Sequence, residues 1–309
     1  MRPELRVRED QRFLHDIGDP MQEITVKPQQ RASRLRGRKV VVKFGGSSIG
    51  GQGAVEAFAK DIALLVSIGI RPIVVHGGGP EISQEMAKRG LTVSKVAGLR
   101  VTDDATLKVA REVLAHINAQ LVDALRRTGS RAVGMSGAED GLVVCMKMHP
   151  AVVKDEQGNQ MLVDLGHVGE VIEIDPSKLD RLVEESTVPV VYPICATREG
   201  ELMNVNADTA AAHLAVAVRA EEFVLITDVL GILRDFKDPE SLVREVKLEQ
   251  LDDLVREGVI RDGMIPKVAA CRLAVEGGVK AAHMVSGKEK DALVNQLLSG
   301  DNVGTRITK

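Results

Sequence analysis

Aromatic residues are scarce in this chain of 309 residues, which has no Trp, one Tyr and five Phe. Hydrophobic residues nevertheless make up 44% of it, so the core must be built mainly from Val, Ile, Leu and Ala. The formal net charge is −3. Proteins that bind nucleic acid usually present a basic face and often stacking aromatics. The sequence therefore gives no reason to expect a nucleic-acid partner.

Cysteines are also few. Cys145, Cys195 and Cys271 lie far apart and form no CxxC pair or Cys/His cluster. We therefore expect no protein metal site and three buried thiols in a reducing compartment. No apolar run approaches the roughly 20 residues of a membrane span, and the charged N-terminus lacks the apolar segment of a secretory signal. These features predict a cytoplasmic protein without a membrane partner.

Residues 1–38 differ in character from the rest. They are polar and aperiodic, and the stretch from Lys27 to Lys39 holds six Lys or Arg and no acid. They are interpreted either as a solvated arm or as an oligomerisation or regulatory arm. From Lys39 onward, short β-branched runs alternate with helical patterns, which predicts an α/β fold with a mostly parallel sheet covered on both faces. The short β runs between Arg131 and Ile174 predict hairpins at the edge of that sheet.

The periodicity also predicts individual elements. Strands are expected at 39–44, 72–76, 188–192, 223–227 and 280–285. Helices are expected at 55–66, 107–125, 207–218, 248–257 and 264–276.

Ligands in such sheets bind beyond the carboxyl ends of the strands, and two glycine-rich loops follow predicted strands. In Lys43–Gly46, a lysine and paired glycines can set one cation and several N–H groups against a phosphate, although a plain tight turn is the alternative. In His76–Glu81, three consecutive glycines precede a proline at a helix start. Such an uncovered backbone attracts an anion.

Two further segments carry polar side chains at helix starts. Asn204 and Asn206 lie on one side of an extended segment and could bind a polar ligand together. Asp208 and Thr209 either cap the helix that follows or serve a ligand. Lys267 lies in the first turns of another helix, where the helix dipole disfavours a cation. An unfavourable position of this kind suggests contact with a polyanion.

Together these loops supply two lysines, two glycine-rich anion sites and one aspartate. Neither a GxxxxGK[ST] loop nor a GxGxxG fingerprint occurs, and no Ser-His-Asp or Cys-His arrangement emerges. The combination fits phosphoryl transfer, in which catalysis is mainly positioning and charge stabilisation.

At this point the chain resembles the acetylglutamate kinases of the amino-acid kinase family, from about Lys39 to Ile307. The matching motifs, in order, are Lys43–Gly46, His76–Pro80, Gly98–Asp103, Leu165–Gly169, Met203–Asp208, Thr227–Leu233 and Asp262–Lys267.

The resemblance implies an open three-layer αβα sandwich with two lobes. After the N-terminal extension, residues 1–38, residues 39–195 would bind the acyl-amino acid and residues 196–309 would bind ATP. The implied reaction is ATP-dependent phosphorylation of the side-chain carboxylate of N-acetyl-L-glutamate, in arginine biosynthesis, with ATP and Mg²⁺. A homo-oligomer is implied as well, a dimer at minimum with a hexamer possible.

The resemblance also assigns roles to residues. The catalytic set is Lys43, Lys267 and Asp208. The substrate-binding set is Gly78, Gly79, Arg100 and Asn204. The nucleotide-binding set is Gly45, Gly46, Asp228, Val229, Leu230, Gly231, Ile232, Leu233, Val259, Ile260 and Arg261.

The chain departs from the family pattern at three places, all nearer the substrate than the phosphoryl group. Ala97 stands where the family usually has Asn, Ala138 where it often has Lys, and Ser47-Ser48 where it often has Asn-Ala. Two alternatives stay open. One is a kinase of another acylated acidic amino acid, such as an aminoadipate derivative, although the Ser-Arg dipeptide of such enzymes is missing at Arg100. The other is a non-catalytic amino-acid sensor, which the presence of both lysines disfavours.

Overall fold

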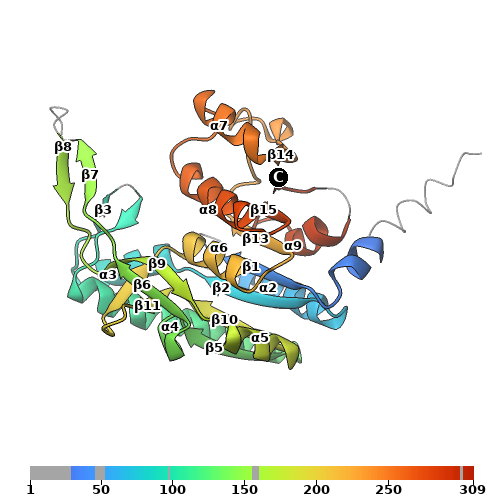
Figure 1. Ribbon diagram of the computed structural model, residues 1–309, viewed down its shortest axis with the longest axis horizontal. Coiled ribbons are helices and arrows are strands. Elements are labelled where there is room, and N and C mark those ends of the chain that lie inside the picture. Colours follow the sequence, from blue (N-terminus) through green and yellow to red (C-terminus); the bar gives the residue numbers. More distant parts are fainter. Residues whose placement is uncertain (1–28, 46–52, 97, 155–159, 300–301) are drawn as a thin grey trace, which may run out of the picture.

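The computed structural model describes residues 29–45, 53–96, 98–154, 160–299 and 302–309. Its centre is one eight-stranded sheet (Figure 1). Neighbouring strands are parallel except for one antiparallel pair, β15 with β16. In spatial order the strands are β14 (Glu245–Lys247), β16 (Thr305–Thr308), β15 (Ala281–Ser286), β13 (Glu222–Thr227), β1 (Lys39–Phe44), β2 (Arg71–His76), β10 (Thr187–Tyr192) and β5 (Arg131–Ser136).

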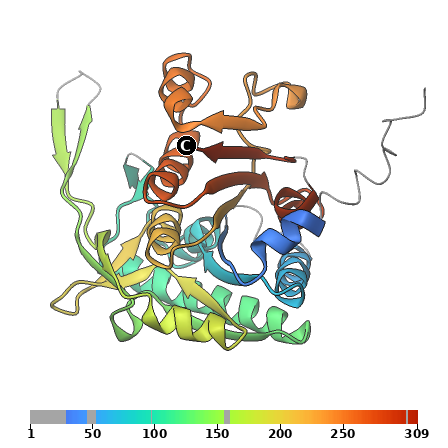
Figure 2. The same cartoon turned by 45° about the vertical axis from the view of Figure 1, so that its right-hand side comes forward.

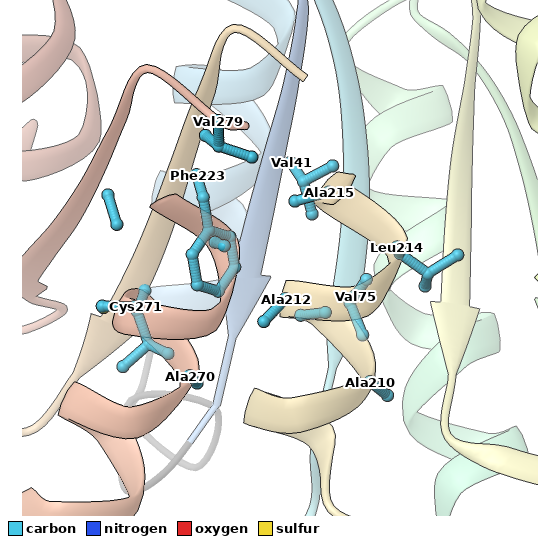
Figure 3. Packing of buried hydrophobic residues seen from close by; sticks show 14 of the residues in the cluster. Val41, Val75, Ala210, Ala212, Leu214, Ala215, Phe223, Ala270, Cys271 and Val279 are labelled. Atoms are coloured by element: carbon cyan, nitrogen blue, oxygen red, sulfur yellow. The ribbon is translucent and has the colours of Figure 1, made fainter. Parts of the chain in front are cut away.

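Helices cover both faces of this sheet. Side chains alternate along a strand, so Val40 and Val42 of β1 pack with α2 and α4, whereas Val41 packs with α6 and α8 on the other face. Figure 3 shows the second face, where alanines of α6 lie close to Val41 and Val75. The helices are α2 (Ala54–Ser67), α4 (Asp104–Arg127), α6 (Ala207–Ala217) and α8 (Met264–Glu276). The predicted αβα sandwich with a mostly parallel sheet is thus confirmed.

Most predicted helices and strands are present, and their ends lie close to the expected residues. Helix α8 begins and ends as expected, at Met264 and Glu276. The other labelled helices are α3 (Gly79–Lys88), α5 (Ser177–Glu184), α7 (Leu248–Arg256) and α9 (Ala292–Val294).

The prediction of hairpins between Arg131 and Ile174 is confirmed for one pair, β7 with β8, but its placement at the edge of the main sheet is wrong. Strand β5 is a parallel strand of the main sheet, because the long helix α4 precedes it and a helical crossover returns the chain in parallel. The next strands leave that sheet. A small closed barrel contains β6 (Val143–Lys147), β9 (Val168–Ile174), β11 (Ile194–Ala196) and β12 (Leu202–Val205). Strands β7 (Ala151–Lys154) and β8 (Gln160–Val163) form a separate hairpin that projects from the body (Figures 1 and 2).

Part of the N-terminal extension docks on the body. Residues 29–35 form a helix, shown in blue in Figure 2, although the sequence there lacks a clear periodicity. Leu35 is fully buried against the α2 face, and Arg34 forms an ion pair with Glu222 of β13. The interpretation as a solvated arm is therefore wrong for this helix. Residues 1–28 lie outside the described part.

Three further expectations can be compared with the structure. Cys145, Cys195 and Cys271 are all buried, as expected. Within the described ranges, no helix has both the length and the apolarity to cross a bilayer. The proposed lobe boundary at residues 195 and 196 falls inside β11, and the division into an amino-acid lobe and a nucleotide lobe stays a prediction.

Candidate active site

A cavity of about 300 Å³ opens beside the carboxyl ends of β1 and β2. The parallel register sets Phe44 beside His76, and the N–H of Gly77 donates to the carbonyl of Phe44 at 3.1 Å, so the loops after the two strands lie together. Every predicted catalytic and substrate-binding residue lines this cavity: Lys43, Gly78, Gly79, Arg100, Asn204, Asp208 and Lys267.

Asp208 lies between the two lysines. Its Oδ1 is 2.8 Å from Lys43 Nζ, and its Oδ2 is 3.6 Å from Lys267 Nζ. The Lys43 and Asp208 side chains are only 7% and 10% exposed, while Lys267 is 22% exposed. Lys43 and Asp208 thus form a close, buried ion pair. The result is a buried cluster of two cations and one anion.

The electrostatics keep Asp208 ionised. Burial raises the pKa of this carboxyl, but the nearby charges of Lys43 and Lys267 outweigh burial and hold the pKa below its ordinary value. One positive charge of the cluster therefore remains uncompensated at neutral pH, which suits an incoming anion.

Local sequence explains how these side chains reach each other. A Cβ at position 45 would collide with Lys43 Nζ, so Gly45 leaves the space that the lysine occupies. Helix α6 is capped by Asn206, whose Oδ1 accepts from the N–H groups of Asp208 and Thr209 at 2.9 and 3.0 Å. The cap engages the Oδ1 of Asn206, and both Asn204 and Asn206 line the cavity, so joint binding of a polar ligand stays a prediction. Because Asn206 caps α6, the carboxylate of Asp208 pairs with the two lysines instead.

Lys267 is at the start of α8, as predicted. Its position near a helix N-terminus is unfavourable for a cation, and Asp208, in the first turn of α6, offsets this.

The glycine loop after β2 is held by a histidine that sequence reasoning missed. His76 is fully buried, and its Nδ1 lies 3.0 Å from the carbonyl oxygen of Gly77. Its Nε2 lies 3.1 Å from Nδ2 of Asn118, which also donates to the carbonyl of Val190 at 2.8 Å. A carbonyl can only accept and an amide NH₂ can only donate, so the partners assign the proton to Nδ1. Burial lowers the pKa of His76 to about 4, and the ring is neutral at pH 7.

Gly78 is packed tightly against α4. A Cβ there would be 2.7 Å from Ile117 Cδ1 and 3.0 Å from Leu114 Cδ2. A side chain at position 78 would force Ile117, Leu114 or the loop itself to shift, so glycine lets the loop lie close to α4 where it borders the cavity.

Arg100 is a buried arginine whose described partners are all neutral. It is 7% exposed, and its guanidinium donates to the Gly79 carbonyl at 2.9 Å and to Ser83 Oγ at 2.7 Å, with Met86 Sδ at 3.2 Å. Burial lowers the pKa of this guanidinium. Since no carboxylate of the described residues pairs with it, it can accept a carboxylate from a ligand. Asn204 also lines the cavity, and its Nδ2 lies 3.4 Å from Thr102 Oγ1.

The predicted nucleotide segment, 228–233, begins directly after β13. Burial raises the pKa of Asp228, but the hydrogen bond from Thr227 and the charges of Lys267 and Lys288 hold it below its ordinary value, which places this loop near the lysine cluster. Ile232 is fully buried, its N–H donates to Thr305 Oγ1 at 2.8 Å, and its carbonyl accepts from Val243. Ile260 is buried in the same core. The side chains of Ile232 and Ile260 therefore pack in the core beneath the predicted nucleotide-binding segments. Gly46 lies outside the described residues.

Comparison with known proteins places this site in a family. Residues 38–286 match the Amino acid kinase family. The chain is 40% identical over 287 residues to an acetylglutamate kinase of Heliobacterium modesticaldum, covering 93% of this chain and 97% of that protein. It is 44% identical over 270 residues to an acetylglutamate kinase of Methanothrix thermoacetophila, covering 87% of this chain and 92% of that one.

Solved structures share the fold at lower identity. N-acetylglutamate synthase of Neisseria gonorrhoeae, complexed with coenzyme A and N-acetyl-glutamate, superposes with a TM-score of 0.78 at 23% identity, over 94% of this chain and 64% of that longer one. Carbamate kinase of Giardia lamblia bound to AMP-PNP superposes with a TM-score of 0.62 at 18% identity, over 88% of this chain and 99% of that one. The chain therefore belongs to the amino acid kinase family, among its acetylglutamate kinases.

Proposed function

We propose that this protein transfers the γ-phosphoryl group of ATP to the side-chain carboxylate of N-acetyl-L-glutamate, a step of arginine biosynthesis. The observation that carries the proposal is a single cavity that holds the Lys43–Asp208–Lys267 cluster together with the buried Arg100, which lacks a carboxylate partner among the described residues. The lysine cluster suits a transferring phosphoryl group, and Arg100 suits the carboxylate of an amino acid.

The chemistry requires no general base. A glutamate side chain, with a pKa of about 4.3, is already ionised at neutral pH. Its oxygen bonds to the γ-phosphorus while the bond from that phosphorus to the β,γ-bridging oxygen breaks, so an acyl phosphate and ADP form and no proton moves. The obstacle is repulsion between two anions. Lys43 and Lys267 offset it, and Asp208 holds both lysines in place before the substrates arrive.

Substrate orientation falls to the other side of the cavity. The planar guanidinium of Arg100 is suited to a two-bond pairing with the α-carboxylate of the acyl-amino acid. Gly78 and Gly79 present backbone at the start of α3, and Asn204 offers an amide to the polar backbone of the substrate.

ATP is assigned to the loop after β13 and the approach to α8, residues 228–233 and 259–261, with Gly45 and Gly46 at its phosphates. Among the described residues, no group of three or more His, Cys, Asp or Glu side chains is placed to hold a metal ion. Mg²⁺ would be bound mainly through the nucleotide phosphates, as is usual for this ion, with Asp228 as the carboxylate that residues 228–233 offer. The Mg²⁺ ion would supply additional positive charge at the phosphates.

We also propose that the protein works in the cytoplasm as a homo-oligomer, at least a dimer with a hexamer possible. Three free, buried cysteines are compatible with a reducing compartment. Light scattering of the full chain measures the assembly, and a monomer at micromolar concentration would contradict it.

The test is an ATP-consumption screen over N-acetylglutamate, N-acetylaspartate, N-acetylaminoadipate, glutamate and carbamate, with the acyl phosphate trapped by hydroxylamine. We expect the highest kcat/KM with N-acetylglutamate. A preference for the aminoadipate derivative would assign the chain to the first alternative, and ATP binding without turnover of any acceptor would indicate a sensor.

Arg100→Lys is the matched variant for this screen. Lysine keeps the charge but cannot form the two-bond pairing of a guanidinium with a carboxylate. We therefore expect KM for the acyl-amino acid to rise by about tenfold or more while KM for ATP stays within about twofold. Equal effects on both constants would show that Arg100 supports the structure rather than the substrate.

A further inference from the structure

A second cavity, of about 290 Å³, lies at the opposite end of the same strands. Its lining includes Arg71, the first residue of β2, and Thr187, the first residue of β10. These strands are neighbours in the sheet and run in parallel. The active cavity borders their carboxyl ends, and this cavity borders their amino ends.

Thr187 contributes a hydroxyl that is buried without a partner. The residue is 5% exposed, and its Oγ1 makes no hydrogen bond within the described ranges. Buried hydroxyls are nearly always bonded, because an unmet hydrogen bond in the interior is costly. The hydroxyl is shielded within the cavity wall, so it can donate to a ligand when the Thr187 side chain turns toward the cavity, and such a turn would give it the partner it lacks.

Two arginines with no described ion-pair partner line the same cavity, Arg36 and Arg71. The Arg36 side chain lies across Gly69, where an added Cβ would be 3.2 Å from its Cγ, and its Nε donates to the carbonyl of Ile68 at 3.3 Å. The remaining guanidinium nitrogens are therefore available. Glu184 also lines the cavity and opposes them with one negative charge. Two arginines against one glutamate leave a net charge of +1.

We propose that this cavity is a regulatory site for a small dianion that bears carboxylate or phosphate oxygens. Arg36 and Arg71 pair with its oxygens, and the hydroxyl of Thr187 donates to one of them. The volume is at the lower end of ligand pockets, which run from about 300 to 1,000 Å³, so a compact metabolite fits better than a nucleotide.

The two shared strands supply the coupling. Strand β2 runs from Arg71 to His76 and continues into Gly77 and Gly78, which line the active cavity. Strand β10 runs from Thr187 to Tyr192 and is followed by Pro193, which lines it too. Occupancy at the amino ends therefore acts on the substrate side of the active cavity, and the effect on affinity must be reciprocal.

Calorimetric titration of the full chain with succinate and, separately, with inorganic phosphate tests binding and distinguishes a carboxylate ligand from a phosphate ligand. All titrations use the Lys43→Ala background, which weakens anion binding in the active cavity. We expect Arg71→Gln to weaken binding by about tenfold and Thr187→Val, an apolar isostere that should fold, to weaken it by about threefold.

Arg131→Gln is the matched control. Arg131 begins β5 at the same edge of the sheet, opposite Thr187 in the register, but it is an exposed partner of Glu185 and does not line the cavity. Equal losses in Arg71→Gln and Arg131→Gln, or no binding of either probe with a Kd below about 10 mM, would overturn the site.

Steady-state assays then test regulation without the Lys43 substitution. The probe that binds should change KM for the acyl-amino acid in the wild type and have a smaller effect in Thr187→Val. An identical response in both proteins would overturn the regulatory role. The calorimetric arm does not depend on the proposed reaction, so the two proposals can fail separately.

Discussion

At the scale of single residues, Asp208 organises the candidate site. Two lysine ammonium groups in a buried cavity repel each other, and a carboxylate between them removes most of that cost. The two lysines differ in environment, since Lys43 is 7% exposed and Lys267 is 22% exposed. Their removal should therefore have similar effects on turnover but different effects on stability.

We predict that Lys43→Ala and Lys267→Ala each lower kcat by at least tenfold, because both lysines offset charge that develops in the transition state. Lys43→Ala should also lower the thermal midpoint, because it removes the nearer partner of a buried carboxylate. Lys267→Ala should leave the midpoint almost unchanged. The measurements are steady-state kinetics and thermal unfolding. A variant that keeps more than a tenth of kcat, a loss of less than about 1.4 kcal/mol of barrier, would remove that lysine from catalysis.

The sequence points to Lys43 and Lys267 because each occupies a marked position, a strand end before glycines and the first turn of a helix. It does not decide the roles of Asn204, Asn206, Asp208 and Thr209, since all four lie near one helix start and each is polar. The cap of Asn206 on two N–H groups is visible only in the folded backbone. The contact of His76 with Asn118 joins residues 42 positions apart, and no local pattern predicts it.

At the scale of elements, the glycine loop after β2 depends on α4. Asn118 of α4 bonds both His76 of β2 and the Val190 carbonyl of β10. Strand β5 leaves room for it, because a Cβ at Gly134 would collide with Asn118 Oδ1. One amide thus connects three elements behind the loop. This arrangement holds the Gly77 peptide in place through a neutral histidine.

The state of His76 predicts a pH effect on stability. Burial lowers its pKa from 6.5 to about 4, so between these values the unfolded chain binds a proton that the folded chain does not. Stability therefore falls as the pH falls through this window, by up to about 3 kcal/mol in total and about 2 kcal/mol between pH 7.5 and pH 5. Urea unfolding of the wild type and of His76→Gln at both pH values measures the difference. Equal pH dependence in the two proteins would show that His76 does not resist protonation.

Alternating patterns predict strands and helices well wherever one element packs on the next in sequence. These patterns do not predict the barrel, because its pairs β12–β9 and β11–β6 join strands that lie far apart in the sequence. Short β runs joined by turns have the same sequence pattern whether they form hairpins at the edge of a sheet or strands of a closed barrel. The helix at residues 29–35 is missed for another reason, since Leu35 is its only fully buried residue and gives no period.

At the scale of the whole molecule, the two predicted lobes share one sheet, and the core clusters on both of its faces combine residues from both halves. Strand β1 pairs with β13 from Val40 to Lys43, so the sheet continues without a break from residues of the first half to residues of the second. The core on the α6 face combines Val41 and Val75 with Phe223 (Figure 3). Separate domains have separate cores, so a cluster that both halves share favours one cooperative unit.

We therefore predict a single unfolding transition in urea. The only tyrosine, Tyr192, is at the end of β10 in the first half, and no Trp obscures its fluorescence. Far-UV circular dichroism follows both halves at once, so coincidence of the two curves tests cooperativity.

Val41→Ala provides a sharper form of this test. Val41 is fully buried beneath α6, and its truncation should cost about 2 kcal/mol through lost burial and the cavity left behind. In one cooperative unit, the tyrosine midpoint and the dichroism midpoint shift together by the same amount. If the lobes unfold separately, tyrosine fluorescence reports only the first, and the dichroism curve divides into two steps of which one is unmoved by the substitution. That result would restore a boundary near residue 195 and would make β1 and β13 the interface between two domains rather than the centre of one.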